Sequence, residues 1–213
     1  LGSAGRYGSQ IEMKNRIGED TIIISVMNGI ESEERIAAVY GMDKVLYALN
    51  MGIDAVREGN RVTYTTQGKI FFGEAKNPTL TERVVRVQAL FKKAGIVHET
   101  PPDMMRILWW KFMVNVGINQ ASAVLRATYA AFQTSSEARD LMESAMQEVI
   151  MIAGKADVDV SVQDIKEFYK ILSGLSPKGK TSMLQDVEAG RKTEVDMLAG
   201  KIIALGKHYG VPT

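Results

Sequence analysis

A lysine and two asparagines recur on a segment that is otherwise almost entirely apolar. Lys111, Asn115 and Asn119 stand four positions apart within residues 107–125. On a helix, at about 100° per residue, they form one narrow polar stripe, which Ser122 extends. A buried ammonium or amide costs free energy unless it finds a partner, so Lys111 should face water, an anion or a ligand. The alternative is that Lys111 reaches the surface and the asparagines bond to neighbouring helices.

A second polar cluster lies near the end of the sequence. It contains Ser-Met-Leu-Gln-Asp at residues 182–186 and Arg-Lys-Thr-Glu-Val-Asp at residues 191–196. Helix punctuation can explain both strings, because the Ser182/Gln185 and Thr193/Asp196 pairs have the spacing of capping boxes. That explanation leaves Glu194 without a structural role, in the first turn of a helix, where the helix dipole favours its ionised form.

A third candidate is the pair Asn28-Gly29, which directly follows the β-branched run at residues 21–27. Such a run is typical of a strand that is buried on both faces of a parallel sheet. Ligands of open α/β sheets bind at the carboxyl edge, where this pair would lie. Asn-Gly also favours an ordinary turn, and the pair taken alone favours that simpler interpretation.

Together these segments resemble the ketopantoate reductase family, which reduces 2-dehydropantoate to pantoate with NADPH. The family's K-x-x-x-N-x-x-x-N helix matches residues 111–119, and its S-M-L-Q-D motif matches residues 182–186. Its R-x-T-E-x-D motif matches residues 191–196, and its N-G pair matches Asn28-Gly29. The four motifs occur in the family's order and spacing, and the resemblance extends from about Gly18 to Thr213.

The resemblance implies catalytic roles for two residues. Lys111 would be the general acid and would polarise the carbonyl group of the substrate. Glu194 would hydrogen-bond the hydroxyl group of the substrate and help to orient it. The chemistry is coherent, because hydride attack on a ketone creates an alkoxide, which a nearby ammonium stabilises and can protonate.

The resemblance assigns the other polar residues to binding. Asn115, Asn119 and Ser182 would hold the substrate, and Asn28 would lie between the nicotinamide and the substrate. Some members carry a further asparagine about ten residues after Asn119, where this sequence has Tyr129. That departure leaves the identity of the substrate open.

The implied function is the reduction of ketopantoate to pantoate, in pantothenate and coenzyme A biosynthesis, by an NADPH-dependent oxidoreductase that acts on a small keto acid. One alternative is a reductase of another 2-keto acid. Another is a catalytically inactive helical fragment that binds a small acid or a partner chain. A homodimer formed through the helical domain is an assembly that the sequence leaves open.

The first half of the sequence predicts mixed α/β structure. Strands are expected at residues 21–27, 44–51, 61–66, 69–72 and 96–98. Gln67-Gly68 should form a hairpin turn between the third and fourth of these strands. Helices are expected at residues 31–40 and 81–94, and the end of another at residues 11–17.

The faces of the two predicted helices follow from their apolar spacing. In the helix at residues 31–40, Ile36 and Val39 should face inward. Thr81 can cap the helix at residues 81–94. The apolar stripe of that helix is expected to comprise Val84, Val85, Val87, Leu90 and Phe91.

Pro101-Pro102 ends the mixed region, and every later segment has helical periodicity. Helices are expected at residues 104–128, 136–155, 162–172, 181–189 and 193–209. We therefore expect an α/β, partial Rossmann-like cofactor-binding domain at residues 1–102, followed by an all-helical substrate-binding and catalytic domain at residues 103–213. The family has the same order of domains.

Composition excludes several other classes of function. The chain of 213 residues has 26 Lys plus Arg against 25 Asp plus Glu, which argues against a nucleic-acid binder. It has no cysteine, and its two histidines are far apart, so we expect no disulfide and no metal site. No apolar run is long enough to span a membrane, and no signal peptide is visible, so we expect a cytoplasmic protein.

Both ends of the sequence depart from the family's pattern. The family begins with a strand and a G-x-G-x-x-G loop that holds the pyrophosphate at a helix N-terminus. This sequence begins Leu-Gly-Ser-Ala-Gly-Arg-Tyr-Gly, and it stops at Thr213, where the family continues. We therefore expect a chain that is truncated at both ends.

Overall fold

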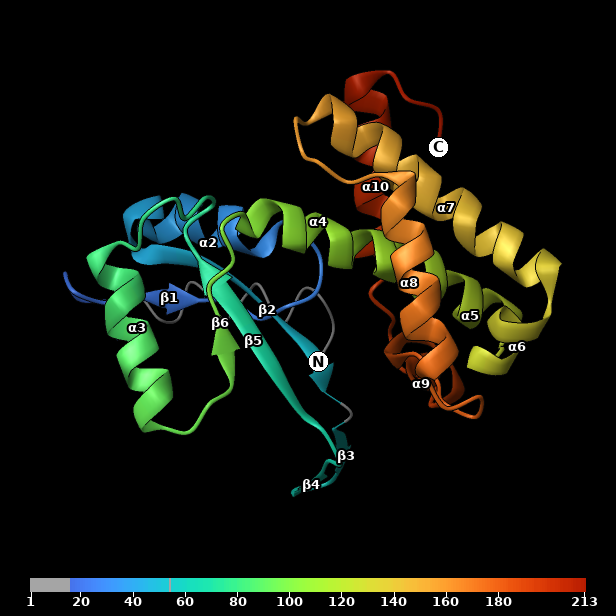
Figure 1. The fold of residues 1–213 in the computed structure, drawn as a ribbon, viewed down its shortest axis with the longest axis horizontal. Helices are drawn as coiled ribbons and strands as arrows, with labels where there is room; N and C mark the ends of the chain where they lie inside the picture. The colour runs from blue at the N-terminus through green and yellow to red at the C-terminus, as the bar shows by residue number, and fades with distance from the viewer. Residues whose placement is uncertain (1–15, 54) are drawn as a thin grey trace. The chain divides into compact units, whose positions relative to one another are not determined.

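The computed structural model describes residues 16–53 and 55–213, which form two compact units (Figure 1). Among these residues, one unit ends at Leu108 and the other comprises Trp109–Thr213. The expected helix end at residues 11–17 falls almost entirely outside the described residues. None of the helices in the described residues is long and apolar enough to cross a membrane.

The first unit contains a four-stranded sheet in the order β1-β2-β5-β6. Its strands are β1 (Ile23–Ile24), β2 (Val45–Ile53), β5 (Gln67–Gly73) and β6 (His98–Glu99). β1 is parallel to β2, β5 is antiparallel to β2, and β6 is parallel to β5. The unit also contains the helices α2 (Ser32–Tyr40), η2 (Met42–Lys44) and α3 (Glu82–Lys93).

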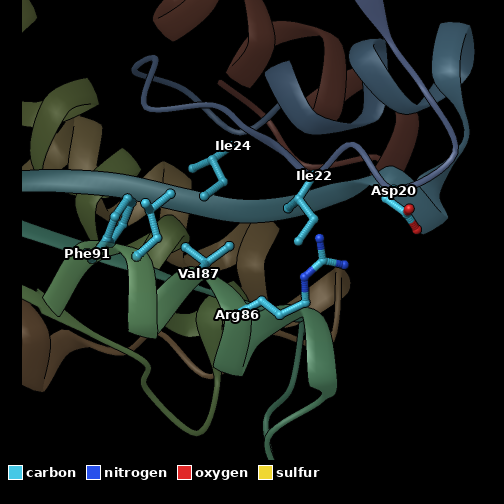
Figure 2. Close-up of a pocket in the computed structure, with 7 residues that line it drawn as sticks. Asp20, Ile22, Ile24, Arg86, Val87 and Phe91 are labelled. Atoms are coloured by element: carbon cyan, nitrogen blue, oxygen red, sulfur yellow. The ribbon is translucent and has the colours of Figure 1, made fainter. Parts of the chain in front are cut away.

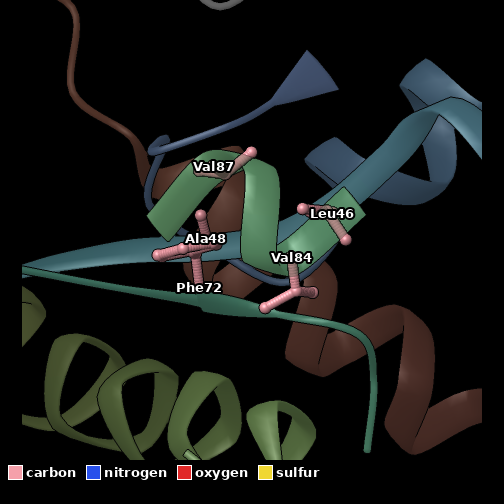
Figure 3. Packing of buried hydrophobic residues seen from close by; sticks show 5 residues of the cluster. All are labelled: Leu46, Ala48, Phe72, Val84 and Val87. Atoms are coloured by element: carbon pink, nitrogen blue, oxygen red, sulfur yellow. The ribbon is translucent and has the colours of Figure 1, made fainter. Parts of the chain in front are cut away.

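Strict alternation along β2 explains why both faces of the sheet are covered. Leu46 and Ala48 point to one face, where they pack with Phe72 of β5 and with Val84 and Val87 of α3 (Figure 3). Leu49 points to the opposite face, where it packs with Met104 and Leu108. Successive side chains of a strand point to opposite faces, so this one strand belongs to two separate hydrophobic clusters.

The predicted hairpin at Gln67-Gly68 is wrong. Both residues lie inside β5, where Gln67 pairs with Ile53 of β2. The tight hairpin instead joins β3 (Val56–Glu58) to β4 (Arg61–Thr63), and Gly59 lies in its turn with φ of 60°. Gly68 has φ of 73°. This left-handed conformation is typical of turns, but here it occurs inside β5, which is paired with β2. A local dipeptide signal cannot distinguish these two uses of glycine.

The first predicted strand is also shorter and less buried than expected. β1 has only two residues, at the edge of the described sheet, and Val26 after it is 50% exposed. The β-branched run therefore forms a strand that is not buried on both faces.

Some predicted helix contacts in this unit are wrong as well. Val39 of α2 is exposed, and so are Val85 and Leu90 of α3, although all three are apolar. Thr81 occupies the N-cap position of α3, but its hydroxyl donates to the Oε1 atom of Glu74, at 2.7 Å, and not to the helix. The apolar stripe of α3 is therefore narrower than the spacing of its residues indicates.

The second unit is entirely helical among the described residues, which confirms the predicted order of a Rossmann-like sheet followed by a helical region. Its elements are the end of α4 (Met104–Val114), η3 (Asn115–Asn119), α5 (Gln120–Leu125), α6 (Tyr129–Thr134), α7 (Ser136–Lys155), α8 (Val162–Gly174), α9 (Ser182–Glu188) and α10 (Val195–Tyr209). The sequence did not predict α6, which is only six residues long.

α7 is the central helix of this unit, because α5, α6, α8, α10 and η3 all pack against it. Its fully buried residues Met142, Met146, Val149 and Ile152 recur at spacings of three and four, as the core face of a helix requires. The Ser135 hydroxyl accepts a hydrogen bond from the backbone N–H of Ala138, so the side chain caps the start of the helix.

Candidate functional site

The polar stripe predicted from the sequence lies where the long helix changes its winding. α4 continues into η3, a single π-helical turn of five residues, and then into α5. The predicted uninterrupted α-helix at residues 104–128 is therefore wrong in this turn. It is also wrong at its end, because Arg126 adopts a left-handed conformation with φ of 50°. Single π turns are rare in α-helices as a whole, but many of those that do occur lie at functional sites.

The two asparagines of the stripe are buried and bonded to each other. The Nδ2 atom of Asn119 donates to the Oδ1 atom of Asn115 at 3.3 Å. Within the described residues, the buried Nδ2 atom of Asn115 has no hydrogen-bond partner. An unsatisfied buried donor costs about 1–3 kcal/mol, so the amide group of Asn115 is available to donate to a bound molecule.

Lys111 lies one helical turn before Asn115 and is half-buried. Burial lowers the pKa of Lys111 from 10.5 to about 8, and the negative charge of Glu194 partly opposes that shift. The structure therefore brings Lys111 and Glu194 into electrostatic interaction, although they are far apart in the sequence. A lysine with a pKa near neutrality can both stabilise a negative charge and release a proton.

Glu194 is the residue that precedes α10, and its side chain does not cap the helix. The capping box expected at Thr193 and Asp196 is absent, since Asp196 instead lies 3.5 Å from the Nζ atom of Lys192. α10 and α9 both pack against η3, so the start of α10 belongs to the same helical cluster as the polar stripe.

Ser182 is the first residue of α9 and is exposed. The capping box expected at Ser182 and Gln185 is wrong by one residue, because Thr181 is the cap and accepts a hydrogen bond from the N–H of Leu184 at 3.2 Å. The hydroxyls of Thr181 and Ser122 also bond to each other at 2.5 Å. Ser122 thus joins α5 to α9, which is a structural use of a residue predicted to extend the polar stripe.

Thr181→Ala is expected to destabilise the protein by about 1 kcal/mol, because it removes a helix cap and a partner of the buried Ser122. Ser182→Ala is the matched control one residue away and should leave the free energy of unfolding nearly unchanged. Urea unfolding of both variants measures the difference. A larger loss in Ser182→Ala would contradict the assignment of Thr181 as the cap.

Asn28 belongs to the first unit, in a bend that follows β1 and precedes α2. Gly29 beside it has φ of 93°, which favours glycine. The hydroxyls of Ser25 and Ser32 bond to each other at 2.8 Å across this bend, and Ser32 in turn donates to the buried carboxyl of Glu33 at 2.7 Å. Burial raises the pKa of Glu33. These hydrogen bonds therefore hold the residues before and after the bend, which follows the carboxyl end of β1.

A shallow pocket of the first unit contains none of the predicted site residues (Figure 2). Ile22 and Ile24 line it from one side, and Val87 and Phe91 of α3 line it from the other, with Arg86 at its rim. Its lining is mostly apolar, and it offers no combination of groups that matches the polar stripe. We therefore place the candidate catalytic groups in the helical unit and not in this pocket, and the Asn28 bend is a separate candidate within the first unit.

Two elements of the site were not predicted from the sequence. One is the π turn, for which Gly117, in a run of bulky residues, is the only local signal. The other is Thr181, which precedes the recognised Ser-Met-Leu-Gln-Asp string and carries the cap.

Comparison with protein families gives matches to both units. The family model described as ketopantoate reductase PanE/ApbA C terminal matches residues 103–213. The model described as ketopantoate reductase PanE/ApbA matches residues 10–77.

Curated relatives cover nearly the whole chain at modest identity. A 2-dehydropantoate 2-reductase of Aquifex aeolicus is 27% identical over 207 residues, which are 95% of this chain and 66% of that protein. A 2-dehydropantoate 2-reductase of Archaeoglobus fulgidus is 26% identical over 194 residues, which are 89% of this chain and 63% of that protein. The chain thus spans slightly less than two thirds of the length of these relatives.

Two solved structures show the same fold at low identity. A dimeric ketopantoate reductase from Staphylococcus aureus has a TM-score of 0.87 and 21% identity, and the match covers 100% of this chain and 70% of that chain. A complex of D-mandelate dehydrogenase with NADH also has a TM-score of 0.87, with 20% identity, and covers 99% of this chain and 71% of that chain. The fold is therefore shared by enzymes that act on different acids.

Proposed function

Since the chain belongs to the ketopantoate reductase family, we propose that it takes part in the NADPH-dependent reduction of 2-dehydropantoate to pantoate. The names of the curated relatives support this substrate. In this proposal, residues 1–102 contribute to cofactor binding, and residues 103–213 bind the keto acid and supply the catalytic groups. The reaction would belong to pantothenate and coenzyme A biosynthesis in the cytoplasm, and the protein would act as a dimer, as the Staphylococcus aureus reductase does.

The observation that carries the proposal is the environment of Lys111. Its pKa of about 8 suits proton donation near neutral pH, and Glu194 keeps the ammonium form populated. A nicotinamide cofactor would supply the hydride. As negative charge develops on the carbonyl oxygen of the substrate, the Lys111 ammonium would stabilise it and then donate its proton to that oxygen.

The remaining residues of the site would hold the substrate. The unpartnered Nδ2 atom of Asn115 fits a carboxylate or keto oxygen, and Asn119 would orient that amide through their mutual hydrogen bond. Ser182, exposed at the start of α9, would donate to the acid as well. Glu194 would accept a hydrogen bond from the hydroxyl of the substrate.

Asn28 would contact the nicotinamide from the first unit. Its bend stands at the carboxyl end of a parallel strand, which is where dinucleotides bind in open α/β sheets. The positive φ of Gly29 fits such a site, because a residue without Cβ allows a cofactor to approach the backbone closely.

A second candidate is the reduction of a different 2-keto acid, which Tyr129 favours. Tyr129 is half-buried, and burial raises the pKa of its hydroxyl. Its ring lies so close to Gly179 that a Cβ atom there would be 2.8 Å from the Cδ2 atom of Tyr129. An aromatic ring at a position where some family members carry asparagine would suit a more apolar acid, as the likeness to D-mandelate dehydrogenase also allows.

Initial rates of cofactor oxidation distinguish these candidates. We expect the purified protein to oxidise NADPH faster than NADH at subsaturating concentrations, and to prefer ketopantoate to phenylglyoxylate. Preference for phenylglyoxylate would favour the second candidate. Equal use of both cofactors would contradict the assignment of NADPH, and no oxidation with either acid would contradict the proposed function.

A further inference from the structure

Gly117, in the middle of the π turn, touches α7 more closely than any other residue type could. A Cβ atom at this position would lie 2.5 Å from the Cγ atom and 2.8 Å from the Cε atom of Met146, and 3.1 Å from the backbone oxygen of Met142. Both methionines are fully buried. A glycine inside a helix costs about 0.5–1 kcal/mol relative to alanine, and this close approach explains why glycine occurs here.

Side chains that follow the turn bond to its backbone. The Nε2 atom of Gln120 donates to the carbonyl oxygen of Val116 at 2.9 Å. The hydroxyl of Ser122 donates to the carbonyl oxygen of Asn119 at 3.2 Å. A π turn changes the regular pairing of backbone groups, and these side chains satisfy carbonyls of the turn. The residues of this segment therefore specify the turn at several positions.

The turn decides how the two asparagines lie relative to each other. Asn115 and Asn119 are the first and last residues of the π turn. A π turn winds less per residue than an α-helix, so the angle between these two side chains differs from that in an uninterrupted α-helix. With the π turn in place, Asn119 donates to the Oδ1 atom of Asn115. That bond engages the acceptor of the Asn115 amide and leaves its buried donor without a partner in the described residues.

We propose that Gly117 is a positioning residue: its contact with Met142 and Met146 holds the π turn, which fixes the Asn119–Asn115 bond and so presents the NH2 group of Asn115 to an acceptor oxygen of the bound acid. The inference rests on the proposed function for the identity of the acid. It adds that the group of the acid facing Asn115 is a carboxylate or carbonyl oxygen, and not a hydroxyl acting as donor.

Gly117→Ala tests the proposal, with Gly154→Ala as the matched control. A Cβ atom at Gly154, which lies on α7, would meet nothing within 4 Å, so that variant should behave as the wild type. We expect Gly117→Ala to raise the KM for ketopantoate about tenfold, which is the loss of one hydrogen bond to a charged group, with a smaller change in kcat. An unchanged KM in a folded Gly117→Ala protein would overturn the proposal.

A size exchange provides the rescue. Met146→Ala removes the atoms that the new Cβ would meet, so Gly117→Ala combined with Met146→Ala should bind ketopantoate within a few-fold of Met146→Ala alone. Met146→Ala alone also removes this contact, so the deciding comparison is with Gly117→Ala: a double variant that binds ketopantoate no better than Gly117→Ala would show that the clash with Met146 is not the cause of the higher KM.

Two further measurements keep the test decisive. If Gly117→Ala does not fold, Gln120→Leu is the substitute, because it removes the hydrogen bond to Val116 without adding bulk against α7. This variant should also raise the KM for ketopantoate, and an unchanged KM would count against the proposal. If the wild-type protein does not use the acid, the proposed function fails. Hydrogen exchange at residues 115–120 then still decides whether Gly117 holds the turn, since exchange should be faster in Gly117→Ala only if it does.

Discussion

Lys111→Met is expected to reduce the turnover of ketopantoate by about a hundredfold or more, because general-acid catalysis contributes about 10²–10⁴-fold. The KM should change less than kcat if the ammonium acts mainly on the developing alkoxide. Asn115→Ala supplies a comparison within the site, since it should weaken binding and spare part of the rate. Lys207→Met, which changes an exposed lysine of α10, is the control and should leave both constants unchanged.

The same substitution should hold or raise the melting temperature at pH 7. Burial lowers the pKa of Lys111 to about 8 in the folded protein, from an ordinary value of 10.5. A base with a lowered pKa binds its proton less tightly in the folded state, so its charge costs stability below about pH 8, and this cost disappears as the pH rises towards 10.5. The advantage of Lys111→Met in thermal melts should therefore be largest below pH 8 and shrink above it.

Steady-state kinetics and thermal melts on the same samples check both expectations. Near-normal turnover in a folded Lys111→Met protein would contradict the proposed mechanism and most of the site assignment. A strongly lowered melting temperature at pH 7 would show that the lysine is structural.

Glu194→Gln is expected to lower kcat/KM by about tenfold or more at pH 7.5 and to move the alkaline limb of the pH profile to lower pH. The negative charge of Glu194 raises the pKa of Lys111, so its removal should leave less of the ammonium form at neutral pH. The variant also loses the acceptor for the hydroxyl of the substrate. The melting temperature should change little, because the side chain of Glu194 does not cap α10.

Asp196→Asn is the matched control, because it removes one negative charge from the first turn of the same helix, on a side chain that is 70% exposed. It should leave the pH profile in place. Glu194→Asp keeps the charge and should restore part of the alkaline limb. Normal turnover in Glu194→Gln together with a large drop in melting temperature would identify Glu194 as a structural residue.

Sequence patterns predicted the elements that are determined by local periodicity. The helix predicted at residues 136–155 matches α7 (Ser136–Lys155), because a long amphipathic stripe and a serine cap both act within the segment itself. The pairing of Lys111 with Glu194 could be inferred only through a family resemblance, since nothing local joins residues so far apart.

The missed features depend on contacts between distant segments. The π turn requires Gly117 to rest on Met146 of α7, and a helical wheel cannot reveal that contact. Gly68 resembles a turn residue, but its positive φ occurs within β5, where the backbone lies beside Asn50 and Met51 of β2. Tertiary contacts therefore decided these positions against their local preference.

The support that α7 gives to η3 limits how proteins with this fold can diverge. Met142 and Met146 are fully buried in the core of the helical unit, and they are also the residues that the π turn contacts. A change in side-chain size at either position should therefore alter the stability of the unit and the geometry of Asn115 together. α8 packs against α6 and also against α7 itself. A new specificity at residues 115 and 119 is therefore expected to require coordinated substitutions in α7.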